Sequence, residues 1–220
     1  MENRQGLTLK SFAVILISAV ISATINLNFP VKTFLTGLGI SGPAGGMIFF
    51  GGIIFTLWIA LAHLATDCKK FSGVFTAILI PAFCMLFSPW YGVTDPPWFG
   101  IYGLAAFLAA GVIIEAACQT GLGYTKMAVG GGTANLACLL VTWLAIGFHT
   151  GAWPSAGLVP FYVVAALISG ATGALIALAL VKRTIRKTFK AKRKRWKSPL
   201  QNIYLPLKFL EVKLYLEKIS

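Results

Sequence analysis

Aromatic and polar side chains that could bind a flat organic molecule gather in two short segments of this chain, 88–98 and 149–153. The candidate binding residues in them are Trp90, Tyr91, Asp95, Trp98, His149 and Trp153. Indole and phenol rings can stack on a heterocycle, while carboxylate and imidazole groups can supply directional polar contacts. The composition therefore predicts a substrate site. The alternative is an aromatic belt at a membrane–water interface, which is rich in the same residues.

Two further polar residues belong to the same predicted site. Asn28 offers an amide at the end of the first apolar stretch, and Tyr162 lies in the outer half of the last one. Pro89, Pro96 and Pro97 stiffen the first aromatic segment, because proline fixes φ and removes a backbone donor. We therefore expect its rings to be held in place before a ligand arrives.

Glu115 is the one acidic residue inside an apolar stretch of the sequence. Burying a carboxylate in a membrane is costly, so such a residue is a candidate site residue by default. It lies about 25 Å along its stretch from the predicted outer end, at a depth similar to that of His63. Substrate contact and a structural contact with His63 are both open from the sequence.

The elements that must position these residues are six apolar stretches. They span residues 11–29, 44–65, 71–87, 98–117, 128–148 and 157–181. A helix of about 20 apolar residues crosses roughly 30 Å of hydrocarbon. We therefore predict an all-α fold, an integral membrane bundle of six transmembrane helices.

Basic residues lie almost entirely on one alternating set of the connecting segments. Every Lys and Arg except Lys32 precedes the first stretch, follows the last one, or lies in the second or fourth connection. Cytoplasmic segments of membrane proteins carry this excess of positive charge. We predict a multi-pass protein of the cell membrane with both termini in the cytoplasm, and with the aromatic segments outside.

The composition excludes a soluble globular protein, since 57% of the residues are hydrophobic and 11% are charged. The net charge of +13 is concentrated near the carboxyl end, where membrane lipids with anionic headgroups are nearer partners than nucleic acid. We divide the chain into a transmembrane substrate-binding domain, 1–184, and a basic cytoplasmic tail, 185–220. Within the tail, 207–219 could form a short amphipathic helix.

Neither a metal nor a cofactor is predicted. The two histidines and four cysteines show no metal-ligand spacing, and the cysteines are expected to be small apolar fillers. The glycine-rich run 129–133 lacks the Lys-Ser/Thr of a phosphate-binding loop and favours close helix packing instead. We therefore expect that the chain cannot energise transport by itself.

Small residues form a stripe on the first apolar stretch. Ala19 and Ala23 are four residues apart, and Ser18 and Ser22 double the stripe on an adjacent line. Residues at this spacing lie on one helix face, where a second helix can approach closely. An isolated pair of this kind more often packs within its own chain than against a partner.

The chain resembles the substrate-binding S component of energy-coupling factor transporters. The resemblance rests on the Ala19/Ala23 pair, the six short spans, the cytoplasmic termini, and an external first connection that ends in Gly42 and Pro43. The resemblance implies that the stripe meets a transmembrane coupling subunit, which connects to two cytoplasmic ATPase subunits. Segment 40–47 is similar to the subgroup for thiamine or its hydroxymethylpyrimidine precursor. The basic tail is longer than the resemblance implies.

We therefore expect a protein that is not an enzyme and that captures a small heterocyclic nutrient from outside. The alternative is a rhomboid-like intramembrane serine protease, because segment 39–42 has the form G-x-S-G with Ser41 as its nucleophile. Catalysis needs a histidine within hydrogen-bond reach of that serine. His63 is about 30 Å down the next stretch, so that only His149 could reach it.

Overall fold

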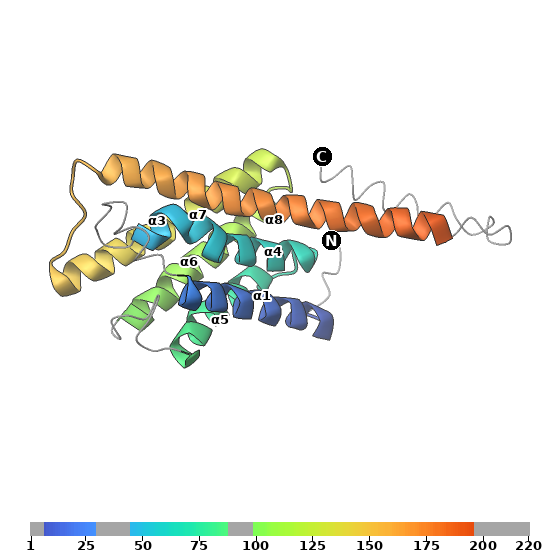
Figure 1. Cartoon of the computed structure of the whole chain (residues 1–220), viewed down its shortest axis with the longest axis horizontal. Helices are drawn as coiled ribbons and strands as arrows, with labels where there is room; N and C mark the ends of the chain where they lie inside the picture. The colour runs from blue at the N-terminus through green and yellow to red at the C-terminus, as the bar shows by residue number, and fades with distance from the viewer. Residues whose placement is uncertain (1–6, 30–44, 88–98, 196–220) are drawn as a thin grey trace.

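The computed structural model describes residues 7–29, 45–87 and 99–195, and within the last range the side chains of 100–184. These residues form helices and turns and no strand (Figure 1). The helices are α1 (Leu9–Asn28), α3 (Gly45–Gly51), η1 (Gly52–Thr56), α4 (Leu57–Ala65), α5 (Ser72–Phe87), α6 (Phe99–Gln119), α7 (Tyr124–Thr150) and α8 (Val159–Arg195).

The helices confirm the prediction of a helical, multi-pass membrane protein. Among the described residues, five helical segments are long and apolar enough to cross a membrane: α1, the continuous α3–η1–α4 segment, α6, α7 and α8. The sixth predicted span is α5, whose 16 residues extend about 24 Å and contain Pro81. A sixth crossing and the orientation of the termini stay predictions.

Basic residues mark one end of the bundle. The first turn of α1 and the carboxyl end of α8 lie toward this end (Figure 1). The turn after α4 carries Lys69 and Lys70, and the first turn of α7 carries Lys126. The start of α7 also contacts α8, because the ammonium of Lys182 on α8 lies 4.0 Å from the centre of the Tyr124 ring on α7. We call this the basic end.

The last helix continues through the predicted domain boundary at residue 184, because α8 ends at Arg195. Its carboxyl-terminal turns therefore carry part of the predicted basic tail. The predicted amphipathic helix, 207–219, lies outside the described residues.

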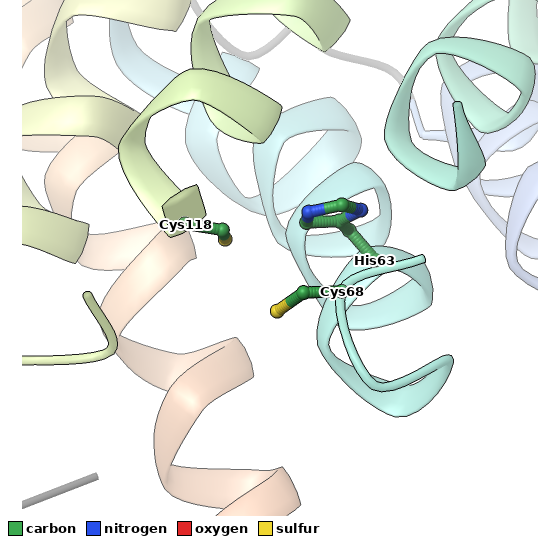
Figure 2. Close-up of side chains that lie close together, drawn as sticks. All are labelled: His63, Cys68 and Cys118. Carbon is green, nitrogen blue, oxygen red and sulfur yellow. The ribbon is translucent and has the colours of Figure 1, made fainter. Parts of the chain in front are cut away.

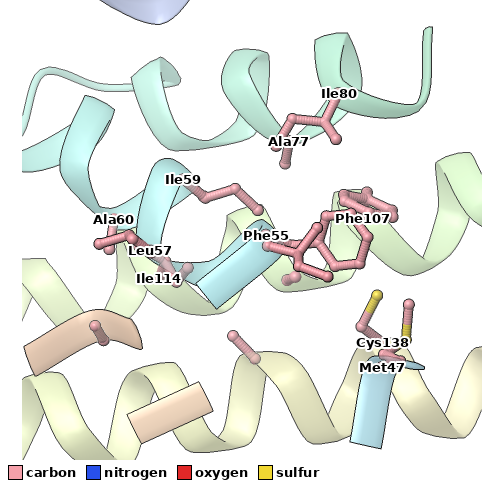
Figure 3. Close-up of a cluster of buried hydrophobic side chains, with 14 of the residues drawn as sticks. Met47, Phe55, Leu57, Ile59, Ala60, Ala77, Ile80, Phe107, Ile114 and Cys138 are labelled. Carbon is pink, nitrogen blue, oxygen red and sulfur yellow. The ribbon is translucent and has the colours of Figure 1, made fainter. Parts of the chain in front are cut away.

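The bundle is organised around α6 and the α3–η1–α4 segment. Helix α6 packs between α5 and α7, α8 packs along α7 and across α3, η1 and α4, and α1 packs against α4 and α5. Phe55 of η1 meets Phe107 of α6 edge to face at 4.8 Å in the centre of the core (Figure 3). Apolar side chains of residues such as Ile59 and Ile80 surround this pair.

Glycines allow the helix backbones to touch, as two contacts show. A side-chain carbon on Gly131 of α7 would overlap Ala174 and the carbonyl of Gly170 on α8. A side-chain carbon on Gly173 would overlap the carbonyl of Gly52 on η1. Such contacts stabilise helix pairs where lipid gives no hydrophobic drive for association. The glycine-rich run therefore packs helices, as the sequence predicts.

The π-helical turn η1 interrupts the second apolar segment and is held by side chains of its neighbours. The Ser169 hydroxyl accepts a hydrogen bond of 3.0 Å from the Gly52 N–H and donates one of 2.9 Å to the Phe49 carbonyl. The Asn135 amide donates to the Met47 carbonyl at 3.2 Å. These bonds satisfy backbone groups that an interrupted helix leaves without regular partners.

Candidate functional site

A Schellman turn at the end of α4 brings Cys68 next to His63. The Cys68 N–H donates to the His63 carbonyl at 2.9 Å, and the Asp67 N–H donates to the Leu64 carbonyl at 3.2 Å. Asp67 and Cys68 both have left-handed backbones, with φ of 58° and 54°. Aspartate tolerates this region better than most residues, whereas for cysteine it is strained.

Cys118, from the last turn of α6, completes a cluster with these two residues. The ligand atoms of His63, Cys68 and Cys118 all lie within 4.8 Å of one another, and the sulfur of Met127 lies 3.6 Å from Cys118 Sγ. His63 and Cys118 are buried and Cys68 is half-buried. Figure 2 shows a ring nitrogen of His63 on the edge that is turned toward the two sulfur atoms.

The hydrogen bonds of Ser72 define the proton position on His63. Ser72 Oγ lies 2.6 Å from His63 Nδ1 and donates its single proton to the Lys69 carbonyl at 2.7 Å. The hydroxyl must therefore accept from Nδ1, which leaves a lone pair on Nε2 of the neutral ring. That nitrogen is buried and has no hydrogen-bond partner in the described part of the chain. An unsatisfied buried acceptor costs about 1–3 kcal/mol.

The same surroundings change the acidity of Cys68, which lies in the turn beyond the membrane-spanning part of α4. Hydrogen bonding from the Cys118 thiol lowers the pKa of Cys68 from 9.0 to about 5, although burial acts in the opposite direction. At neutral pH the thiolate therefore predominates. The thiolate is the form of cysteine that acts as a nucleophile or a metal ligand.

Glu115 lies beside this cluster and caps α5. Its carboxylate accepts hydrogen bonds from the backbone N–H groups of Phe71, Gly73 and Val74, at 3.1, 3.0 and 3.2 Å. The first N–H groups of a helix lack intrahelical acceptors, and the helix dipole favours a negative charge there. Glu115 Oε1 also lies 4.0 Å from His63 Nδ1, which is the structural contact that the sequence left open beside substrate contact.

Ring-bearing side chains gather at the opposite end of the bundle, which we call the aromatic end. The rings of Tyr102, near the start of α6, and His149, near the end of α7, meet edge to face with centroids 5.0 Å apart. His149 Nδ1 lies 3.1 Å from the carbonyl of Ala145. Phe148 and Trp153 make a second edge-to-face contact at 5.5 Å. Two of the predicted site residues therefore lie in adjoining ring pairs.

The other predicted binding residues have different surroundings. Tyr162, near the start of α8, is buried against Trp143 with ring centroids 6.3 Å apart. Asn28 is exposed at the end of α1 and donates to the Thr24 carbonyl of its own helix at 2.8 Å. The remaining candidates, which lie outside the described residues, are Trp90, Tyr91, Asp95 and Trp98.

The alanine stripe on α1 faces the interior of the bundle. Ala19 and Ala23 both have 0% exposure, and the neighbouring Ser22 hydroxyl donates to the Ile54 carbonyl of η1. The expectation that the stripe meets a partner subunit therefore does not fit this structure. The physical reason is that α4 and α5 of the same chain already use the close approach that small residues permit.

The chain matches no protein-family model, no curated protein and no solved structure.

The cluster of His63, Cys68 and Cys118 was missed in the sequence. Its members are five and fifty residues apart, which is not a recognised ligand spacing. Only the turn after α4 and the parallel packing of α6 beside α4 bring them together. The available signal was depth, because the sequence places all three residues near the same, basic side of the predicted membrane spans. Tyr102 was also missed, since one tyrosine in an apolar stretch has no distinguishing pattern.

The structure does not test the protease alternative. Ser41 lies outside the described residues. His63 lies at the basic end with its Nδ1 beside Ser72, and His149 lies at the aromatic end beside Tyr102.

Proposed function

We propose that this protein is a substrate-capture subunit of an energy-coupling factor uptake transporter in the cell membrane. In this proposal its aromatic end faces outward and binds a small heterocyclic nutrient, such as thiamine or its hydroxymethylpyrimidine precursor. The observation that supports it best is the contact between Tyr102 of α6 and His149 of α7 at that end. An aromatic face beside an imidazole suits a flat, polar, ring-shaped ligand.

The close helix packing supports the same proposal. Residues Gly131 and Gly170 bring the backbones of α7 and α8 into contact, so the helices that carry His149 and Tyr162 are held firmly against each other. A site whose walls are ordered before the ligand arrives loses less entropy on binding. Rigid walls therefore favour tight capture at low nutrient concentration.

Transport in this proposal depends on partners. The sequence has no nucleotide-binding motif, so two cytoplasmic ATPase subunits, linked by a transmembrane coupling subunit, would supply the energy. The buried Ala19 and Ala23 cannot form the contact with the coupling subunit while α1 stays in this position. We therefore assign the coupling contact to a surface other than the alanine stripe. The basic end faces the cytoplasm, where the ATPase subunits would assemble.

Mass spectrometry of small molecules that co-purify with the detergent-solubilised protein tests the proposal. A heterocyclic vitamin or precursor, bound in about equimolar amount, is expected. Titration of the purified protein with a panel of such compounds, followed by tryptophan fluorescence, gives the affinity. The proposal fails if nothing co-purifies and no compound changes the fluorescence. Cleavage of helical peptides by the same preparation would instead favour the serine protease alternative.

A further inference from the structure

We propose that His63, Cys68 and Cys118 form a binding site for one thiophilic metal ion, Cu(I), at the basic end of the bundle. The site is separate from the aromatic end, so this inference does not depend on the proposed nutrient-binding function. The site lies where three segments of the chain meet: the end of α4, the turn that follows it, and the end of α6 (Figure 2).

The three ligand atoms are close enough for one ion. They lie within 4.8 Å of one another. Ligands around an ion bound at about 2.3 Å in a trigonal arrangement are roughly 4 Å apart. The difference requires movements of less than about 1 Å, which rotation of the Cys68 side chain in its half-buried turn can supply.

The unpartnered nitrogen of His63 points to a ligand. Nε2 is buried, and no hydrogen-bond partner for it lies within the described ranges. Because Nδ1 donates to Ser72 Oγ, the lone pair is on Nε2, the nitrogen that a metal would require. Metal-binding histidines commonly donate their other N–H to an oxygen in this way, which fixes the tautomer and the ring orientation. Ser72 therefore acts as a positioning residue.

The ligand set selects the ion. Two cysteine thiolates are soft ligands and imidazole is a borderline one, and a further soft donor, the Met127 thioether, lies 3.6 Å from Cys118 Sγ. Zinc requires a fourth ligand in a tetrahedral site, commonly a further Cys or His or a water molecule. The adjacent carboxylate, Glu115, is already bonded to three backbone N–H groups. A buried set of two thiolates, one imidazole and a nearby thioether fits Cu(I) better.

Binding changes protonation but involves no oxidation or reduction. Cys68 and Cys118 coordinate as thiolates, and each thiol that is protonated beforehand releases its proton to solvent. Two thiolates and a neutral imidazole around Cu(I) give the site a net charge of −1. Lys69 and Lys70 belong to the same turn and lower the cost of this negative charge.

Anaerobic competition with a coloured Cu(I) chelator, bicinchoninate, tests the site on the full-length protein in detergent. The wild-type protein is expected to withdraw one Cu(I) per chain from the chelator. Cys68→Ser and Cys118→Ser should abolish this withdrawal. Cys84→Ser and Cys138→Ser are matched controls, because they remove the same chemical group elsewhere in the bundle, and they should retain it. Ser72→Ala should weaken binding by about 10- to 100-fold.

A second measurement on the wild-type protein keeps the test decisive if a variant fails to fold. Cu(I) should protect Cys68 from alkylation by N-ethylmaleimide, and bathocuproine disulfonate should restore the reaction. X-ray absorption at the copper edge should show two or three sulfur neighbours and one nitrogen. The proposal is overturned if no Cu(I) is withdrawn, if a folded double variant Cys68→Ser/Cys118→Ser still binds it, or if Zn(II) is held more tightly than Cu(I).

Discussion

The Glu115 carboxylate on α6 accepts a hydrogen bond of 3.0 Å from the backbone N–H of Gly73 in the first turn of α5. Capping groups are usually supplied by the residue that precedes a helix. Here the acceptor comes from a neighbouring helix, so one carboxylate both satisfies the start of α5 and joins two helices. A side-chain carbon on Gly73 would lie 3.1 Å from Glu115 Cγ, which shows how close this approach is.

Removing the carboxylate should therefore destabilise the bundle. Glu115→Ala leaves three N–H groups without an acceptor, and we expect a loss of about 1–3 kcal/mol, seen as a lower midpoint of thermal unfolding. Glu115→Gln keeps one acceptor oxygen and should lose less. Nutrient binding by the folded variants should be unchanged. Lost binding with an unchanged midpoint would instead support substrate contact by Glu115.

The contact between α7 and α8 should not tolerate even one added methyl group. In Gly131→Ala the new carbon overlaps Ala174 and the Gly170 carbonyl, so the helices must separate. Overpacking of this kind costs about 1–3 kcal/mol. Gly157→Ala is the control, since nothing lies within 4 Å of the added carbon. Equal unfolding midpoints for the two variants would show that the backbones are not in contact.

Cys68 should react with iodoacetamide at a rate that changes little between about pH 6.5 and 8.5. Its pKa is lowered from 9.0 to about 5, so the reactive thiolate is already formed throughout this range. The associated stabilisation is complete above pH 9 and is lost as the pH falls through about 5. Peptide mapping of alkylated, metal-free protein measures the rate, and Cys68→Ser is the control. A rate that rises about tenfold per pH unit in this range would indicate an ordinary thiol.

Removing rings at the aromatic end should weaken nutrient binding. Tyr102→Ala and His149→Ala each delete one member of a ring pair, and each should cost about 1 kcal/mol of binding free energy, roughly a fivefold rise in Kd. Tyr124→Ala is the matched control, because that ring lies at the basic end beside Lys182. Fluorescence titration with the co-purifying compound measures all three. A similar loss in the control would place the site elsewhere.

The sequence predicted well where the helical segments lie in the chain, but predicted poorly which side of each helix is buried in the bundle. The predicted stretches 44–65 and 71–87 agree with the helical segments Gly45–Ala65 and Ser72–Phe87 within one residue, because runs of apolar residues mark where these helical segments begin and end. Such runs do not reveal which face of a helix meets protein and which meets lipid. Large apolar residues such as Phe12 and Ile17 are exposed on α1, while Ala19 is buried.

The candidate sites were predictable only in part for a related reason. At the aromatic end, the sequence drew attention to His149 and Trp153 because they belong to a short ring-bearing segment after an apolar stretch, and their role in a site stays a prediction. The cluster at the basic end depends on the left-handed Asp67 and Cys68 after α4 and on the depth of Cys118 in α6. Both features depend on backbone conformation and packing, and neither leaves a recurring spacing in the sequence. The capping role of Glu115 was hidden for the same reason, since its partners are backbone groups.

Labelling in intact cells tests most directly the claim that the aromatic end faces outward. A membrane-impermeant maleimide is applied to two proteins. In the double variant Trp153→Cys/Cys68→Ser it reports on the aromatic end, and in the wild-type chain it reports on Cys68 at the basic end. The account predicts that the cysteine introduced by Trp153→Cys is labelled in intact cells, and that Cys68 is labelled only after permeabilisation. The reverse pattern would contradict the orientation and, with it, nutrient capture from outside.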